Sequence, residues 1–125
     1  MTALFYNHMV VLSREPHTTN QVFHALADGT RRDIVRRCLQ GEHSISTLAR
    51  NYPMSFAAVQ KHVAVLERAQ LVTKRRRGHE QLVLGNVGTI RQAYGLLEQL
   101  EATWRDRIAR MDEILSEDPR EGENK

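Results

Sequence analysis

Four consecutive cations, Lys74, Arg75, Arg76 and Arg77, form the strongest chemical signal in the chain. Like charges this close repel one another, so an anion is expected to offset them: solvent counterions, an acidic partner or phosphate. A cationic edge strand that resists aggregation is the simpler interpretation, but that device rarely requires four charges in a row. We therefore favour phosphate as the partner of this run.

The segment before the run predicts a helix that reads bases. Ser55 is a typical helix N-cap, and Val59, Val63 and Leu66 recur at the spacing of one buried helix face. The opposite face combines short side chains, which permit close approach to a duplex, with polar ones that reach base edges. Its members are Phe56, Ala57, Gln60, Lys61 and Ala64.

Several of these side chains have a chemical match on DNA. Gln60 can pair with the N6/N7 edge of adenine, Lys61 with guanine or a phosphate, and Ala57 can touch a thymine methyl. On most helices, Gln and Lys side chains are simply solvated. Only the place of these two residues in a helix that follows a short helix and a tight turn favours contact with DNA. The predicted DNA-binding residues are Ser55, Phe56, Ala57, Gln60, Lys61, Lys74, Arg75, Arg76, Arg77 and His79.

Two further groups have a structural alternative. His62 lies between the two faces of this helix, where a histidine is more often packed and hydrogen-bonded than a ligand, so we assign it a structural role and leave a phosphate contact as the alternative. A second basic cluster lies earlier in the chain, and internal pairing is at least as strong an interpretation for it as DNA contact. The cluster is Arg31, Arg32, Arg36 and Arg37, and the acids considered as its partners are Asp28, Asp33 and Glu42.

The elements that must position these residues follow from periodicity and turn signals. Residues 44–52 predict a short helix, and with the turn at Pro53 and the helix after Ser55 they make a helix-turn-helix pattern. Two strand-like runs around Arg77 and Gly78 predict a hairpin.

The last predicted element is a long amphipathic helix from Val87 to about Leu115, roughly 40 Å in length. Such a helix exceeds what a body this small can cover, so its apolar stripe predicts a homodimer interface rather than a fold back onto its own core. The predicted interface residues are Tyr94, Leu97, Trp104, Ile108 and Met111.

Two phrases in the chain carry a family resemblance. "FHALADGTRRDIVRRCL" and "MSFAAVQKHVAVLERAQLVTKRRRG", at this spacing, resemble the ArsR-type winged-helix repressors of bacteria, and the resemblance covers roughly residues 20–115. Members usually carry Pro where this chain has Gly29 and Gly where it has Gln70. The second difference predicts local strain, because glycine would end a helix there in the left-handed conformation.

The resemblance implies a fold and a function. The expected fold is mainly α with a small β-hairpin (α+β), a winged helix-turn-helix with a long C-terminal dimerisation helix. The expected function is that of a homodimeric repressor of transcription that binds an inverted repeat in double-stranded DNA. The alternative is a protein-interaction or dimerisation module that does not bind DNA.

The expected organisation has four parts. Residues 1–19 are an N-terminal segment and a candidate for part of the dimer interface, and residues 20–86 are the DNA-binding domain. Residues 87–115 are the dimerisation helix, and residues 116–125 a disordered tail.

Charge is distributed unevenly along the 125 residues, although the net charge is only +3. Residues 1–97 hold 13 Lys and Arg against 6 Asp and Glu, whereas residues 98–125 hold 5 against 9. A basic body suggests an anionic partner, with nucleic acid first among the candidates.

Other chemistries find little support in the residues. The predicted helix-turn-helix has no cysteine, residues 87–115 have no histidine, and the single thiol, Cys38, lies on an apolar stripe. We therefore expect no metal site, no cofactor and no enzymatic activity. No residue pattern identifies a small-molecule effector. One cysteine and the lack of a long apolar run predict a cytoplasmic protein without membrane contact.

Overall fold

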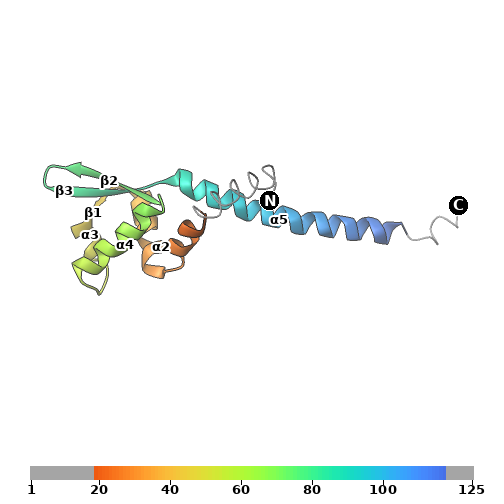
Figure 1. The fold of residues 1–125 in the computed structure, drawn as a ribbon, viewed down its shortest axis with the longest axis horizontal. Coiled ribbons are helices and arrows are strands. Elements are labelled where there is room, and N and C mark those ends of the chain that lie inside the picture. The colour runs from red at the N-terminus through yellow and green to blue at the C-terminus, as the bar shows by residue number, and fades with distance from the viewer. Residues whose placement is uncertain (1–18, 118–125) are drawn as a thin grey trace, which may run out of the picture. The chain divides into compact units, whose positions relative to one another are not determined.

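The computed structural model describes residues 19–117, which are mainly helical with one small sheet, as expected (Figure 1). Residues 1–18 of the predicted N-terminal segment and residues 118–125 of the predicted tail lie outside the described residues. The chain divides into two compact units, Met1–Ala93 and Tyr94–Lys125. Residues 19–26 are helical, and the elements after them are α2 (Gly29–Gln40), β1 (His43–Ser44), α3 (Ile45–Ala49), α4 (Phe56–Arg68), β2 (Val72–Arg77), β3 (Glu80–Gly85) and α5 (Val87–Ser116).

Three helices of the first unit begin at polar N-caps. The side chains of Asp28, Ser44 and Ser55 each accept a hydrogen bond from the backbone amide three residues further on, at 3.0, 3.1 and 3.1 Å respectively. Each bond satisfies one of the amides that a helix start leaves without an intrahelical acceptor. The predicted helix starts at residue 44 and at Ser55 are thereby confirmed.

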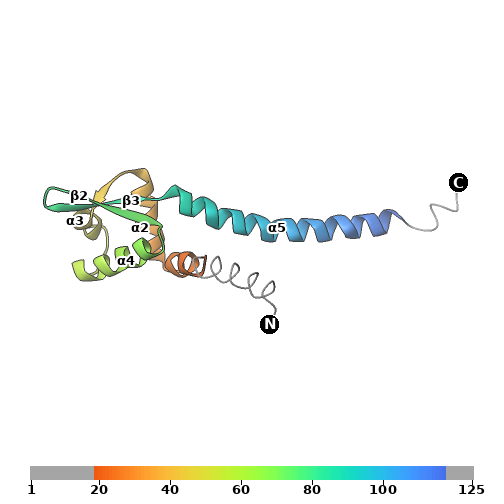
Figure 2. The same ribbon diagram turned by 45° about the horizontal axis from the view of Figure 1, so that its top comes forward.

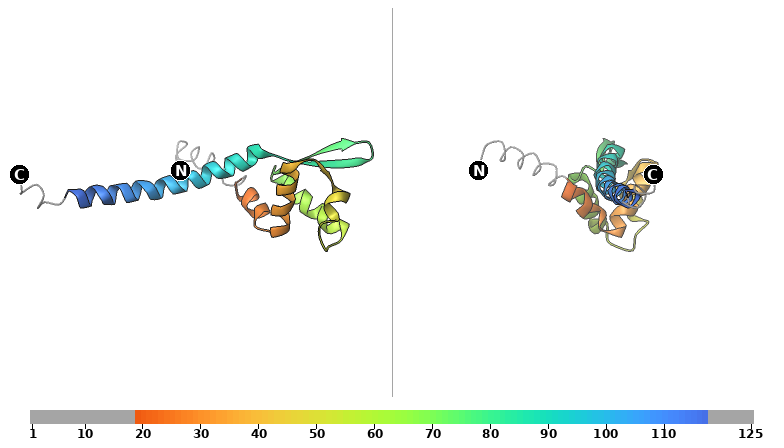
Figure 3. Two further views of the ribbon diagram at one scale, coloured as in Figure 1. Left: turned by 180° about the vertical axis from the view of Figure 1, so that it is seen from behind. Right: turned by 90° about the vertical axis from the view of Figure 1, so that its right-hand side faces the viewer.

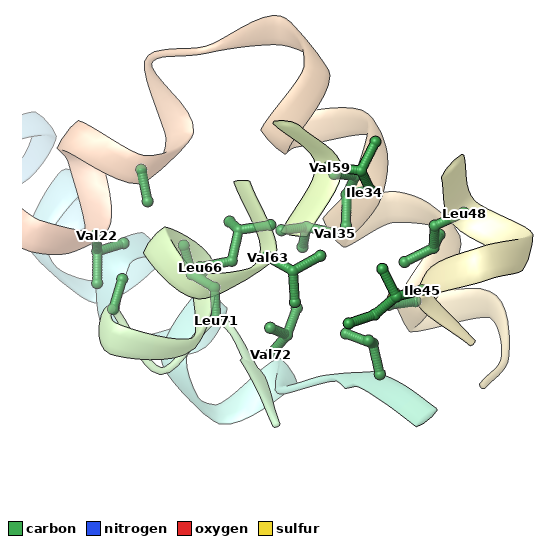
Figure 4. Packing of buried hydrophobic residues seen from close by; sticks show 14 residues of the cluster. Val22, Ile34, Val35, Ile45, Leu48, Val59, Val63, Leu66, Leu71 and Val72 are labelled. Atoms are coloured by element: carbon green, nitrogen blue, oxygen red, sulfur yellow. The ribbon is translucent and has the colours of Figure 1, made fainter. Parts of the chain in front are cut away.

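The core of the first unit is built from apolar side chains of its helices and of strands β2 and β3. Val59, Val63 and Leu66 of α4 are fully buried and pack with Ile34 of α2 and Leu48 of α3, as Figure 4 shows. The spacing of these three residues of α4 leaves the opposite face of the helix free of core contacts. The core therefore determines which face of α4 is available to a partner.

The sheet has the strand order β1-β3-β2 and is antiparallel throughout. The helices α2, α3 and α4 lie on one side of the β2–β3 hairpin, as seen in Figure 2 and from behind in Figure 3. The third strand, β1, is not part of the sequence prediction, because two residues carry no periodic signal. A Cβ on Gly85 would lie 2.9 Å from the backbone nitrogen of Leu39, so this glycine lets α2 approach β3 closely.

Gln70 ends α4 in the left-handed conformation, with φ of 61°, as the family comparison predicts. The backbone amide of Leu71 donates to the carbonyl of Leu66 at 2.9 Å, and the backbone amide of Gln70 donates to the carbonyl of Glu67 at 2.9 Å. This pair of hydrogen bonds is the Schellman motif. The carbonyl of Gln70 accepts from Asn86 Nδ2 at 2.9 Å and from the Thr89 hydroxyl at 2.6 Å. The strained residue thus also fixes the first turn of α5 in the first unit.

The second unit continues α5 as a helix with an exposed apolar stripe. The exposed fraction of the side chains in this stripe ranges from 38% at Ile108 to 72% at Leu115. At 30 residues, α5 as a whole is about 45 Å long. Among the described residues, no helix combines the length and hydrophobicity needed to cross a membrane.

Candidate nucleic-acid interface

The exposed face of α4 carries the residues predicted to read bases. Phe56 is 46% exposed, which is unusual for an aromatic side chain of a small domain, and Ala57, Gln60 and Lys61 are also exposed. Ala64 is half-buried at the margin of this face. Short or flexible side chains at these positions would allow the helix to enter a major groove without steric hindrance. We refer to Phe56, Ala57, Gln60 and Lys61 as the α4 face.

The turn between α3 and α4 is held by side chains from both sides. Asn51 Nδ2 donates to the carbonyl of Thr47 at 3.1 Å, and the Tyr52 hydroxyl donates to Asp33 of α2 at 2.7 Å. Arg37 Nε also donates to Asp33, at 2.8 Å, and its guanidinium lies 5.9 Å from the centroid of the Tyr52 ring. These contacts determine where Ser55 begins α4.

The charges in this cluster are strongly coupled. Hydrogen bonds from Tyr52, then from Arg37 and Arg36, hold the pKa of the Asp33 carboxyl well below its usual range. Burial, reinforced by the bond to the Asp33 carboxylate, raises the pKa of Tyr52 to about 12. Both shifts favour the pair in which Asp33 is ionised and Tyr52 is protonated.

The arginines of the basic cluster on α2 form hydrogen bonds and ion pairs within the protein, which was one of the two interpretations left open by the sequence. Arg31 Nε donates to the carbonyl of Ala25 at 2.7 Å, and Arg32 donates to that of Leu26 at 2.7 Å, so both satisfy carbonyls at the end of the helix at residues 19–26. Arg36 and Arg37 pair with Asp33. These four arginines therefore support the fold.

His62 takes the structural position expected for it. It is half-buried, and its Nδ1 lies 3.3 Å from a guanidinium nitrogen of Arg31. This contact ties α4 to α2 on the side between the core and the α4 face.

The run of cations lies on β2, followed by a two-residue tip. The backbone φ of Gly78 is positive, at 64°, whereas that of His79 is not positive. This combination is typical of a hairpin turn with glycine at its first central position. Arg75, Arg76, Arg77 and His79 are exposed. Side chains alternate between the two faces in the first four residues of β2, since Val72 and Lys74 are more buried than Thr73 and Arg75.

Two acidic partners of the run were missed by the sequence analysis. Lys74 Nζ lies 3.3 Å from Glu67 of α4, and an Arg75 guanidinium nitrogen lies 2.6 Å from Glu42, in the segment between α2 and β1. Glu42 therefore pairs with Arg75, and not with an arginine of α2 as considered above. Because Glu42 and Arg75 are 33 residues apart, no local spacing could have indicated their contact.

The remaining ionisable groups do not form a metal site. Within residues 19–117, no three His, Cys, Asp or Glu side chains are grouped as metal ligands would be. Cys38 is buried, and burial raises the pKa of its thiol to about 11. A thiol of this kind is held in the protonated, unreactive form at neutral pH.

The fold and the exposed α4 face define a winged helix-turn-helix protein, and comparison with known proteins gives its family. An ArsR-like transcriptional regulator from Rhodococcus sp. RHA1 is 30% identical, with a TM-score of 0.70, over 78% of this chain and 92% of that one. The homodimeric winged helix-turn-helix DNA-binding domain of Mb0332 from Mycobacterium bovis, a possible ArsR-family transcriptional regulator, has a TM-score of 0.57 at 24% identity, over 75% of this chain and 83% of that one. The chain belongs to the ArsR family of transcriptional regulators.

A curated relative matches part of the chain. The HTH-type transcriptional regulator Rv2034 of Mycobacterium tuberculosis (strain ATCC 25618 / H37Rv) is 46% identical over 59 residues, which are 47% of this chain. The match covers 55% of that protein, so the chain spans about half the length of this curated relative. No family model matches the chain. The named relatives are regulators of transcription, which agrees with the expectation that the chain is not an enzyme.

Proposed function

We propose that this protein is a homodimeric repressor of transcription that binds an inverted-repeat operator in double-stranded DNA. The observation that carries the proposal is the α4 face, which is exposed and has Lys61 as its one charged residue, on a helix whose next element is the cationic strand β2. Uncharged residues suit a groove, where bases are read, and cations suit the phosphates beside it. Family membership supports the same conclusion.

The α4 face would read the bases. Gln60 presents an amide that can donate to N7 and accept from N6 of adenine, and Lys61 can donate to guanine or to a phosphate. Ala57 and Phe56 supply apolar surface for the methyl group of thymine. Ser55, at the N-terminus of α4, lies where backbone amides favour a phosphate.

The β2–β3 hairpin would lie along the sugar-phosphate backbone as the wing. Its run from Lys74 to Arg77 supplies the positive charge, and His79 at the tip is placed to reach the minor groove or the adjacent phosphates. Binding by such a surface releases condensed counterions, so its affinity falls steeply as salt rises.

A second copy of the chain would cover the exposed stripe of α5. Tyr94, Leu97, Trp104, Ile108 and Met111 are between 38% and 62% exposed, and a contiguous apolar stripe of this kind favours an isologous dimer. The Mb0332 domain of the same fold is homodimeric. In a two-fold dimer, two α4 helices would address half-sites about 34 Å apart, and the bound dimer would block access to the promoter.

The decisive experiment is selection of bound duplexes from a random DNA pool, followed by affinity measurements at several salt concentrations. The expected result is an enriched inverted repeat with half-sites about one helical turn apart, bound with a steep salt dependence. A winged-helix module that contacts only proteins would enrich no sequence and would fail to bind duplex DNA even at low salt. That outcome would contradict the proposal.

A further inference from the structure

The four cations of β2 have different electrostatic surroundings. Lys74 and Arg75, nearest the base of the hairpin, each face a carboxylate from an element outside it: Glu67 at 3.3 Å and Glu42 at 2.6 Å. Arg76 Nε donates to the carbonyl of Gly78 at 3.3 Å, within the hairpin itself. Within residues 19–117 no carboxylate lies in ion-pair distance of Arg76 or Arg77.

The absence of a partner for Arg77 is informative because an acid is close in the sheet. Glu80 is the cross-strand partner of Arg77 in the hairpin register, yet the two side chains form no ion pair in the described part of the chain. Among residues 19–117, no carboxylate therefore competes with an external anion for the guanidinium of Arg77.

The two ion pairs hold β2 from opposite sides. Consecutive side chains of a strand point to opposite faces, so Glu67 of α4 holds one face through Lys74 and Glu42 holds the other through Arg75. This matters because β2 is an edge strand, which has only β3 as a backbone partner. The pairs add side-chain contacts between the hairpin and both α4 and the segment before β1.

An ion-paired cation also gains less from DNA than a free one. To bind a phosphate, Arg75 would have to exchange one anion for another, and Glu42 would then be left unpaired beside the negatively charged backbone. Arg77 meets no such penalty, because no carboxylate in the described part of the chain is paired with its guanidinium.

We propose that Lys74 and Arg75 are positioning residues that keep Glu67 and Glu42 as partners in the DNA complex, and that Arg76 and Arg77 make the phosphate contacts of the wing. This inference rests on the proposed function, since it divides the work of the wing among its four cations. Glu42 and Glu67 thereby become part of the DNA-binding apparatus although they contact no DNA.

The first test is the salt dependence of binding, measured by fluorescence anisotropy with the full chain and its selected duplex. The slope of log affinity against log salt is negative, and Arg77→Gln is expected to make it less steep by about 0.9 for each protomer, because one phosphate contact is lost. Arg75→Gln is expected to weaken binding by a similar factor at every salt concentration, with the slope unchanged. An equal drop in slope for both variants would overturn the inference.

The second test exchanges the charges of one ion pair. Arg75→Glu alone should bind DNA poorly, and Glu42→Arg combined with Arg75→Glu should recover affinity to within about threefold of the unchanged protein, with the same salt slope. The matched control combines Glu42→Arg with Arg77→Glu, which has the same net charge but no restored pair. We expect no such recovery in the control, with binding remaining well below that of the exchanged pair.

Failure of the inference differs from failure of the proposed function. Equal recovery in the exchanged pair and in the control would show that only net charge matters, and would overturn the ion-pair role while leaving DNA binding intact. An unchanged protein that binds no duplex at low salt would overturn both. Thermal melting followed by circular dichroism identifies any variant that has failed to fold, and in that case Arg75→Gln and Arg77→Gln still decide the question.

Discussion

The Tyr52 hydroxyl donates a 2.7 Å hydrogen bond to the carboxylate of Asp33, and so joins the turn before α4 to the middle of α2. The two residues are 19 positions apart, and the same carboxylate also binds Arg36 and Arg37. Since Ser55, the N-cap of α4, lies three residues after Tyr52, this bond helps to set the position of the α4 face relative to the core.

Tyr52→Phe is expected to lower the free energy of unfolding by about 1 kcal/mol, because one hydrogen bond to a partly buried carboxylate is lost while its arginine partners remain. Urea denaturation at neutral pH measures the change. Tyr94→Phe is the control, since the Tyr94 side chain is 62% exposed and its hydroxyl should contribute little. Equal effects of the two substitutions would contradict a specific role for the Tyr52 bond.

The lowered pKa of Asp33 predicts how the stability of the protein changes at acidic pH. The folded protein keeps this carboxylate ionised at pH values below the ordinary pKa of 3.8, so between the folded and unfolded pKa values the unfolded chain binds more protons. The stability that Asp33 contributes is therefore present above about pH 4 and is lost as the pH falls. Asp33→Asn should be less stable at neutral pH and should show a flatter decline in acid, measured by urea denaturation across the acid range.

Gln70→Gly is expected to stabilise the protein by about 0.5–1 kcal/mol, because glycine adopts the positive φ of 61° without strain, and this gain exceeds the added entropy of the unfolded chain. The hydrogen bonds of the Gln70 carbonyl are retained, since they involve only the backbone of this residue. Gln92→Gly, on an exposed helical position of α5, is the control and should destabilise by about 1 kcal/mol. Thermal melting compares the two.

Gly29→Pro is expected to stabilise the protein by about 0.4–1 kcal/mol. Gly29 is the first residue of α2, where the amide has no intrahelical acceptor, and Asp28 before it has an extended backbone that tolerates a following proline. An added Cβ would lie 3.7 Å from Arg32, an ordinary contact. A fall in melting temperature would show that the family's proline does not suit this chain.

Gln60→Ala is expected to relax base preference at one position of each half-site, with a loss of about 1–3 kcal/mol of discrimination and little change in the salt slope. Arg77→Gln should give the opposite pattern, with weaker binding to all sequences. Repeating the duplex selection with each variant distinguishes them. Unchanged affinity and unchanged preference for Gln60→Ala would exclude Gln60 from the groove.

Local features of the fold could be predicted because they depend on spacing within one segment. The caps Asp28, Ser44 and Ser55 and the buried stripe of α4 follow from residue type and helical period alone. The strained conformation of Gln70 could also be predicted, because the family that the chain resembles usually has a glycine at this position. The division of α4 into a buried and an exposed face was therefore determined by the sequence itself.

Only the tertiary structure decided which charges meet. The pairing of Arg75 with Glu42 and of Asp33 with Tyr52 joins elements that are far apart in the chain, and so does the third strand that β1 adds to the sheet. Such contacts depend on how helices and strands pack around a shared core, and side-chain periodicity within each element contains no information about that packing. The run of four cations alone suggests that the charge of the wing is uniform. Which of these cations are paired with carboxylates is for this reason a property of the folded protein.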